Sequence, residues 1–325
     1  MAIRFSVGQA FSVEGRDAVA RAAYEARLPI GNARVAFALV IASVEYDFQA
    51  VFNSARTQIG DVPMIGFSTT GELTHTGSHR RSVVVALLVD DDLRCDSGWL
   101  PDFAEKSVAS MRRLLETLSL TSEHKGLLLL IADGLGGEYE DMVQHMPPGR
   151  YQLAGGLASG DLRLGVTYQC GGNRAGDGGL AGAFLAGENL KVGIGTAHGW
   201  RPVGANFEIT GVSGQWVRAL DGQPATESYA SLFGREAKDW TLPPLNTLVR
   251  LYPLGVVRDD QQMVVRAPLR VEMDGSLRMS STLETGSVGK LLVGSREKCL
   301  QAAREASQSA LAELGEDHPP RFGIV

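Results

Sequence analysis

Cysteine is scarce in this sequence: only Cys95, Cys170 and Cys299 occur in 325 residues. They stand far apart and form no CxxC pair, which argues against a disulfide framework or a structural zinc motif. The formal net charge is −6 and no large basic block is present, so nucleic acid is not expected as the main partner. No apolar run is long enough to span a bilayer, and the N-terminus lacks the apolar core of a signal peptide. Together these absences predict a cytoplasmic protein without a membrane span.

Glycine, in contrast, is abundant. The chain has 39 glycines, about 12% of its residues against roughly 7% in ordinary proteins. They are spread along the chain, a pattern that favours a strand-rich fold with many tight turns and close backbone approaches. The length favours two domains.

Two passages follow one order of elements. Residues 33–100 and 125–200 each predict a strand, a helix and two further strands, which indicates an internal duplication. Aligning them sets GFSTTGE (66–72) against GGLASGD (155–161), so that each copy has a glycine, small residues, a second glycine and an acid. Chance matching in a glycine-rich chain is the alternative explanation.

The ends of the two passages also match, since 91–103 and 187–203 each contain a Gly-Trp pair. After residue 200 the pattern changes to β-hairpins joined by DG and TG turns, followed by a helix over 295–314. We therefore expect an α/β (α+β) protein. Its domain 1–200 would be an internally duplicated β-α-β-β domain, and 201–325 a smaller mixed α/β domain rich in antiparallel hairpins.

The two glycine-rich turns are the candidate ligand site. Backbone N–H groups and hydroxyls of the first turn could bind a carboxylate or phosphate while Glu72 receives an ammonium group, a combination that suits a zwitterionic amino acid. The second turn would form the opposite wall of one pocket. The alternative is structural, with the glycines at positive φ and the hydroxyls capping backbone groups. The residues of this expected site are Gly66, Ser68, Thr69, Thr70, Gly71, Glu72, Gly155, Gly156, Ser159 and Asp161.

Ser68, Cys170 and His198 also allow alternative functions. A hydrolase could use Ser68 or Cys170, although the serine does not stand in a G-x-S-x-G motif and the cysteine has no basic neighbour in sequence. His198 is expected at the end of a buried strand, beside Trp200 and Arg201. It could contact a ligand or serve as an axial haem ligand, with the arginine neutralising a carboxylate or propionate. No metal site is expected otherwise.

Five segments of the sequence resemble the FIST sensory domain, a bacterial signal-input module. They are MIGFSTTGEL, AGGLASGD, GWRPVG, LDGQPATESY and DGSLRMSSTLETGSVGKL, which lie in this order between residues 64 and 291. The resemblance as a whole covers about residues 30 to 310. The family has an N-terminal and a C-terminal part, and the latter normally continues past the equivalent of Val325, so the resemblance implies a truncated second domain. Phe67 stands where the family usually has cysteine.

The resemblance implies a non-catalytic input module that senses a small molecule, such as an amino acid, and passes the signal to a histidine kinase or a cyclic-di-GMP enzyme. A branch of the family binds haem and reports nitric oxide, which makes His198 the candidate ligand in that alternative. Our first expectation is that the protein binds no cofactor, and haem is the alternative.

Overall fold

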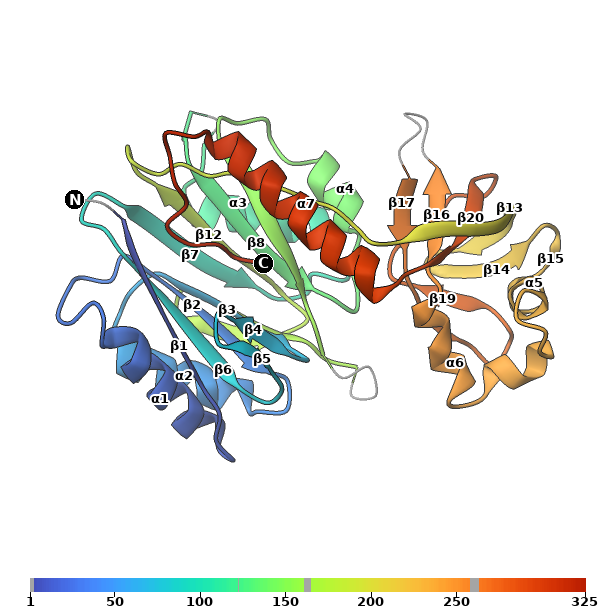
Figure 1. Ribbon diagram of the computed structural model, residues 1–325, viewed down its shortest axis with the longest axis horizontal. Coiled ribbons are helices and arrows are strands. Elements are labelled where there is room, and N and C mark those ends of the chain that lie inside the picture. The colour runs from blue at the N-terminus through green and yellow to red at the C-terminus, as the bar shows by residue number, and fades with distance from the viewer. Residues whose placement is uncertain (1–2, 122, 161–164, 258–262) are drawn as a thin grey trace. The chain divides into compact units, whose positions relative to one another are not determined.

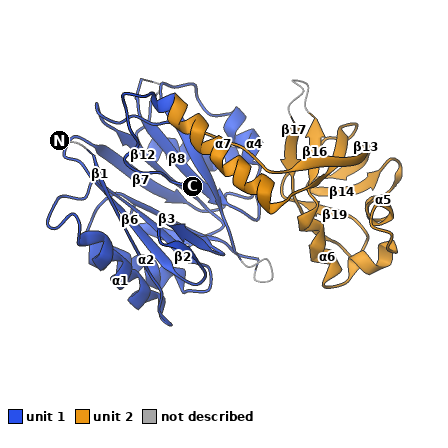
Figure 2. Cartoon of the chain, in the orientation of Figure 1, with its two compact units in different colours: residues 1–193, 313–325 blue, residues 194–312 orange. Residues whose placement is uncertain are grey.

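The computed structural model describes residues 3–121, 123–160, 165–257 and 263–325, and these form two compact units (Figures 1 and 2). The first contains residues 1–193 and 313–325, and the second contains residues 194–312. The expected α/β fold class is confirmed. Within the described ranges, no helix combines the length and apolarity needed to cross a membrane.

The first unit contains two large sheets. One has the order β1 (Arg4–Ala10), β6 (Val83–Val89), β2 (Phe37–Ser43), β3 (Met64–Thr69), β10 (Tyr168–Gly171) and β11 (Arg174–Asp177). The other has the order β7 (Arg94–Leu100), β12 (Leu180–Ala186), β8 (Leu127–Asp133) and β9 (Gln152–Ala158). A short hairpin of β4 (Glu72–Thr74) and β5 (Gly77–His79) is separate from both.

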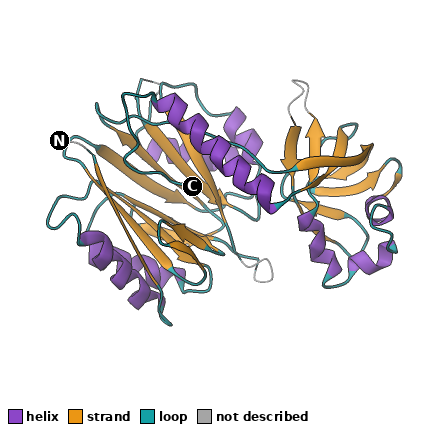
Figure 3. Cartoon of the chain, in the orientation of Figure 1, coloured by secondary structure: helices purple, strands orange, loops and turns teal. Residues whose placement is uncertain are grey.

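Helices cover the outer faces of these sheets, which gives an α/β/β/α arrangement (Figure 3). The apolar faces of α1 (Gly15–Arg27) and α2 (Phe48–Ile59) pack on the six-stranded sheet. Those of α3 (Ser107–Thr117) and α4 (Tyr139–Gln144) pack on the four-stranded sheet. Side chains of both sheets, including Leu39 and Leu129, form the layer between them. Strands buried on both faces explain the long apolar runs in the sequence.

Strand pairing follows the same pattern in two parts of the first unit. β1 pairs with β6 from Arg4–Val89 to Ala10–Val83, and β7 pairs with β12 from Arg94–Ala186 to Leu100–Leu180. β2 lies antiparallel to β6 and parallel to β3, as β8 lies antiparallel to β12 and parallel to β9. The repeating unit is thus β1-α1-β2-α2-β3-β6 followed by β7-α3-β8-α4-β9-β12.

This pairing corrects one feature of the sequence alignment. Residues 94–100 open the second copy, because β7 corresponds to β1. Residues 187–200 contain no strand, so the Gly-Trp match between the two passages does not reflect equivalent structure.

The glycines that open the two turns occupy equivalent positions. Gly66 lies opposite Val40 in the β2–β3 pair, and Gly155 lies opposite Leu130 in the β8–β9 pair. A Cβ on Gly66 would come 2.6 Å from the Val40 carbonyl oxygen, and one on Gly155 would come 1.9 Å from that of Leu130. Both distances are far below contact distance. The shared glycine is therefore required by strand packing in each copy.

The copies differ beside these glycines. In the second copy the hairpin β10–β11 leaves its own sheet and adds to β3, pairing Gln169 with Phe67 and Cys170 with Gly66. In the first copy the corresponding connection forms only the small β4–β5 hairpin. β3 is consequently an interior strand, whereas β9 is at the edge of its sheet.

The second unit is built on an antiparallel, nearly closed sheet. Its order is β17 (Met263–Arg266), β16 (Leu254–Val257), β20 (Val288–Val293), β13 (Arg201–Ser213), β14 (Trp216–Leu220), β19 (Leu277–Met279) and β18 (Pro268–Val271), with β15 (Gln223–Pro224) beside β14. Two short helices, α5 (Ala225–Ser231) and α6 (Leu245–Leu248), and the 3-10 turns Ala237–Thr241 and Val249–Leu251 connect its strands. An aromatic cluster of Tyr229, Phe233, Trp240 and Tyr252 lies in its core.

The last helix and the segment after it belong to different units. α7 (Arg296–Leu314) lies largely in the second unit, where residues 194–200 run along it without regular structure. The chain then returns to the first unit, where the Phe322 ring stacks on Phe5 with centroids 4.4 Å apart. The second unit is therefore inserted in the first along the chain.

Candidate functional site

The two glycine-rich turns meet directly in the first unit. The Ser159 amide donates to the Ser68 carbonyl oxygen at 2.9 Å, and the Ser68 hydroxyl donates to the Ser159 carbonyl oxygen at the same distance. The same hydroxyl accepts from the Tyr168 amide at 2.9 Å, and the Thr70 amide donates to Ser159 Oγ at 3.1 Å. Ser68 is fully buried. These bonds fasten the two copies together at the carboxyl ends of β3 and β9.

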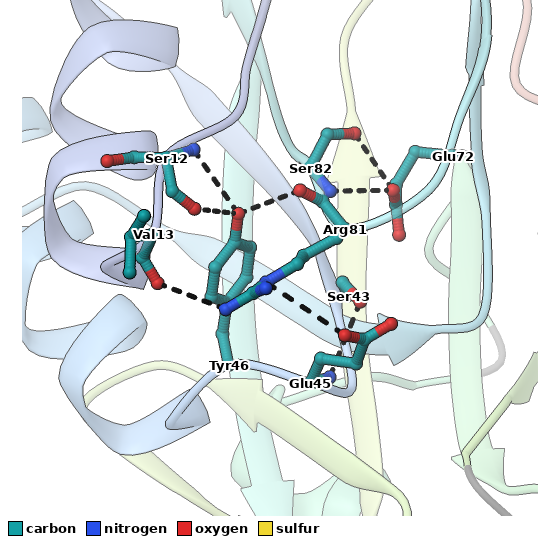
Figure 4. Close-up of polar contacts among 8 residues, drawn as sticks. All are labelled: Ser12, Val13, Ser43, Glu45, Tyr46, Glu72, Arg81 and Ser82. Atoms are coloured by element: carbon teal, nitrogen blue, oxygen red, sulfur yellow. Dashed lines mark hydrogen bonds and ion pairs between the residues drawn. The ribbon is translucent and has the colours of Figure 1, made fainter.

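The Glu72 carboxylate is also committed to internal bonds (Figure 4). It is 2% exposed, and one oxygen accepts from the Ser82 amide at 3.0 Å and from the Ser82 hydroxyl at 2.8 Å. The other oxygen accepts from the Thr69 hydroxyl. A carboxylate with three internal donors is not arranged to receive the ammonium of a ligand, so the structural interpretation fits Glu72 better than the expected role.

Neighbouring loops close the same edge of the six-stranded sheet. Tyr46 Oη lies 2.8 Å from the Ser12 carbonyl oxygen and 2.7 Å from that of Arg81, while the Arg81 guanidinium lies 3.9 Å from the Glu45 carboxylate (Figure 4). The loops after β1 and β2 are thus tied to the segment before β6. The contacts at this edge hold the loops together and thus have a structural role.

The remaining residues of the expected site are scattered. Thr70, Gly71, Gly155, Gly156 and Ser159 are exposed, so their accessible groups form an open surface beside the junction. Asp161 lies outside the described residues. His198 and Arg201 are in the second unit, so the two glycine-rich turns and the His-Arg pair belong to separate bodies.

His198 does not end a buried strand, which corrects the sequence-based expectation. It is exposed in the irregular segment before β13. A Cβ on Gly199 would lie 2.7 Å from the Cys299 amide nitrogen, so this segment packs closely on α7. The Trp200 ring lies against Gly294, 3.0 Å from where a Cβ would stand there. The Trp200 ring is thus partly covered, which leaves less flat apolar surface beside His198 for a porphyrin to contact.

The candidate nucleophiles fit catalysis poorly. Ser68 has its hydroxyl between a carbonyl acceptor and an amide donor, with no histidine among those partners. Cys170 is buried in β10, and burial raises the pKa of its thiol well above the usual range, which leaves it protonated. Among the residues that the structure describes, no three His, Cys, Asp or Glu side chains gather in a metal-binding cluster.

A cleft of about 800 Å³ lies elsewhere in the first unit, around the segments that precede β2, β3 and β7. Charged side chains of both signs line it: Arg27, Arg34, Arg94, Asp61, Asp91 and Asp96. Sequence reasoning missed this cleft because its lining comes from several distant segments. One sequence feature could have indicated the cleft: Arg34 stands shortly before the strand β2, and Arg94 is the first residue of β7.

Two of the charged groups in the cleft are held by neighbours. Arg27 Nη1 donates to the Ala33 carbonyl oxygen at 2.9 Å, and Asp61 pairs with Arg56 at 2.8 Å. No ion pair involves Arg34, Arg94, Asp91 or Asp96 within the described part of the chain. Burial, followed by the charges of Asp96 and Asp90, raises the pKa of Cys95 to about 12, so this cleft residue keeps its proton at neutral pH.

Comparison with protein families agrees with the resemblance seen in the sequence. The FIST N domain model matches residues 36–223 and the FIST C domain model matches residues 225–324. The chain belongs to the FIST family. FIST domains are sensory signalling domains, so the expected family and its general role are confirmed, while the ligand is a separate question.

More specific likenesses are weak. No curated protein matches the chain. Among solved structures, a cyanuric acid hydrolase from A. caulinodans is similar at 11% identity, with a TM-score of 0.29, over 58% of this chain and 72% of that one. At this level the likeness carries no argument about the activity of the FIST chain.

Proposed function

We propose that this FIST protein is a non-catalytic sensor whose first unit binds a small zwitterionic metabolite, such as an amino acid, in the charged cleft. The observation that supports this is that two guanidinium groups (Arg34 and Arg94) and two carboxylate groups (Asp91 and Asp96) around one cavity make no ion pair with any residue that the structure describes. Its volume of about 800 Å³ falls in the range of small-molecule sites, ~300–1,000 Å³.

The arginines would recognise the acidic end of the ligand. Guanidinium groups bind carboxylates through two parallel hydrogen bonds. Arg34 and Arg94 are exposed at the cleft and free of ion pairs among the described residues, so binding would not require an existing pair to break. Asp91 and Asp96 would attract the ammonium group.

A binding role suits this cleft better than a covalent one. Cys95 supplies the thiol that lines the cleft, and because its pKa is about 12, its thiolate fraction at neutral pH is negligible. Binding would instead alter the start of β3, since Val62 and Pro63 also line the cleft. Because β3 ends at the Ser68–Ser159 junction, a shift along the strand could reach the contact between the two copies. The proposed recipient of the signal is a histidine kinase or a cyclic-di-GMP enzyme, as the family resemblance implies.

Calorimetry with a panel of protein amino acids tests the proposal. For any amino acid that binds, its methyl ester and its N-acetyl derivative should each bind more weakly, because each removes one of the two charges. The double variant R34A/R94A should lose roughly 10- to 100-fold in affinity, from ~1.5–3 kcal/mol for a hydrogen bond to a charged group. Arg21→Ala on the exposed face of α1 is the matched control.

Two results would overturn the proposal. One is that no amino acid of the panel binds the intact protein. The other is that a bound amino acid keeps its affinity in R34A/R94A while circular dichroism shows a normal fold.

A further inference from the structure

β9 presents an open edge. Its residues Gly155 and Gly156 are exposed, and Leu157 is 47% exposed. The Gln152 amide donates inward to the Gly126 carbonyl oxygen, so by strand alternation the peptide groups of Leu153, Gly155 and Leu157 point outward. In the described part of the chain, these outward groups have no strand to pair with.

The equivalent edge in the first copy is covered. There β10 runs antiparallel to β3 and pairs with Phe67, Gly66 and Ile65. By the register of the two copies, these residues correspond to Gly156, Gly155 and Ala154 of β9. The fold therefore accepts an antiparallel strand at this position once already.

β9 also lacks the features that protect other edges. The edge strands β1, β7 and β11 carry charged residues, including Arg4, Arg94, Asp96, Arg174 and Asp177. The sequence of β9, QLAGGLA, contains neither a charge nor a proline. Natural proteins use charges, prolines and bulges to prevent edge pairing. Without them, the edge of β9 is open to pairing with another strand.

We propose that β9 pairs antiparallel with β9 of a second copy of this chain, forming a two-fold dimer with one continuous sheet. Centring the pair on Gly155 brings the outward peptide groups into hydrogen-bonded positions, at two bonds for each such pair. Leu157 then faces Leu153 of the second copy, and Ala154 faces Gly156. The strand is nearly self-complementary in this register, with leucine opposite leucine and small residues opposite small residues, which is what an isologous contact requires.

The dimer is expected to be weak. A single pair of seven-residue strands buries less than the ~1,200 Å² typical of stable interfaces. Association should therefore depend on protein concentration in the micromolar range and above.

Sedimentation velocity and hydrogen exchange on the full chain test the proposal. The wild-type mass should rise from monomer to dimer with concentration. Leu157→Lys, which places a charge on the edge, should weaken association at least tenfold. Leu73→Lys is the control, because Leu73 is 67% exposed on β4, which belongs to a separate two-stranded sheet.

Hydrogen exchange of the wild type reports the register and does not depend on any variant folding. The amides of Leu153, Gly155 and Leu157 should exchange more slowly at high concentration, whereas that of Gly156 should not change. A wild type that remains monomeric at all concentrations would overturn the proposal. So would a dimer that Leu157→Lys leaves intact, or protection that appears only outside β9.

Discussion

Replacing Glu72 distinguishes a structural carboxylate from a ligand-binding one. In Glu72→Gln the side chain can turn its remaining oxygen toward the amide and hydroxyl of Ser82, and its NH₂ group toward Thr69, whose hydroxyl can rotate to accept. The geometry survives but the charge is lost. Hydrogen bonds to charged groups contribute ~1.5–3 kcal/mol and neutral ones ~0.5–1.5. For the two bonds from Ser82, the free energy of unfolding should fall by about 2 kcal/mol.

Glu72→Ala should cost more, because it leaves the buried amide of Ser82 without an acceptor and creates a small void. An unsatisfied buried donor costs ~1–3 kcal/mol beyond the lost bonds, so we expect about 4 kcal/mol in total. Glu45→Gln is the matched control. Glu45 is exposed at the same edge and lies 3.9 Å from Arg81, and such surface pairs contribute at most ~1 kcal/mol.

The assay must report the first unit alone, since the two units can unfold separately. Hydrogen exchange of β6 during a urea titration does this, because β6 is a buried interior strand of the six-stranded sheet. If Glu72→Gln unfolded at the wild-type urea concentration and bound an amino acid more weakly, the carboxylate would belong to the ligand site and our reasoning would be wrong.

Three further predictions follow from single side chains. Ser68→Ala should lower the free energy of unfolding of the first unit by roughly 1–3 kcal/mol, measured by the same titration, because the partly buried amide of Tyr168 loses its acceptor. Wild-type stability would contradict this. Alkylation of Cys95 by iodoacetamide should be slow at pH 7–8 and accelerate toward pH 12, because its thiol has a pKa of about 12. Mass spectrometry would compare its alkylation rate with that of the exposed Cys299. Equal rates at pH 7 would refute a protonated Cys95. Haem titration should give no stoichiometric Soret shift, and a shift that His198→Ala abolishes would instead support a haem sensor.

Local patterns in the sequence predicted the elements of the first unit well. The apolar spacing of residues 15–27 and 47–58 predicts two helices, and the structure has helices over Gly15–Arg27 and Phe48–Ile59. Both have regular apolar spacing that one face buries against a sheet. The alignment of Gly66 with Gly155 also agrees with the strand register, because the same close approach to a carbonyl requires glycine in both copies.

Features set by distant partners were not predictable in this way. The sequence shows that the first turn contains hydroxyls and an acid, but it does not show their hydrogen-bond partners. In the structure the Glu72 carboxylate accepts from Ser82, and the Ser68 hydroxyl donates to Ser159. Residues 187–200 have strand-like composition, yet they pack on α7, where close contacts at Gly195 and Gly199 take the place of strand pairing. The cleft likewise depends on segments that only the fold brings together.

The stacking of Phe322 on Phe5 has a consequence for how the protein is made. At ~5–20 residues per second, the ribosome delivers Phe322 roughly 15–60 s after Phe5. During that interval the layer between the two sheets lacks one of its aromatic rings, and the whole second unit is synthesised before the ring arrives. The Phe5 ring of the nascent first unit is thus without this stacking partner until almost all of the 325 residues have been made.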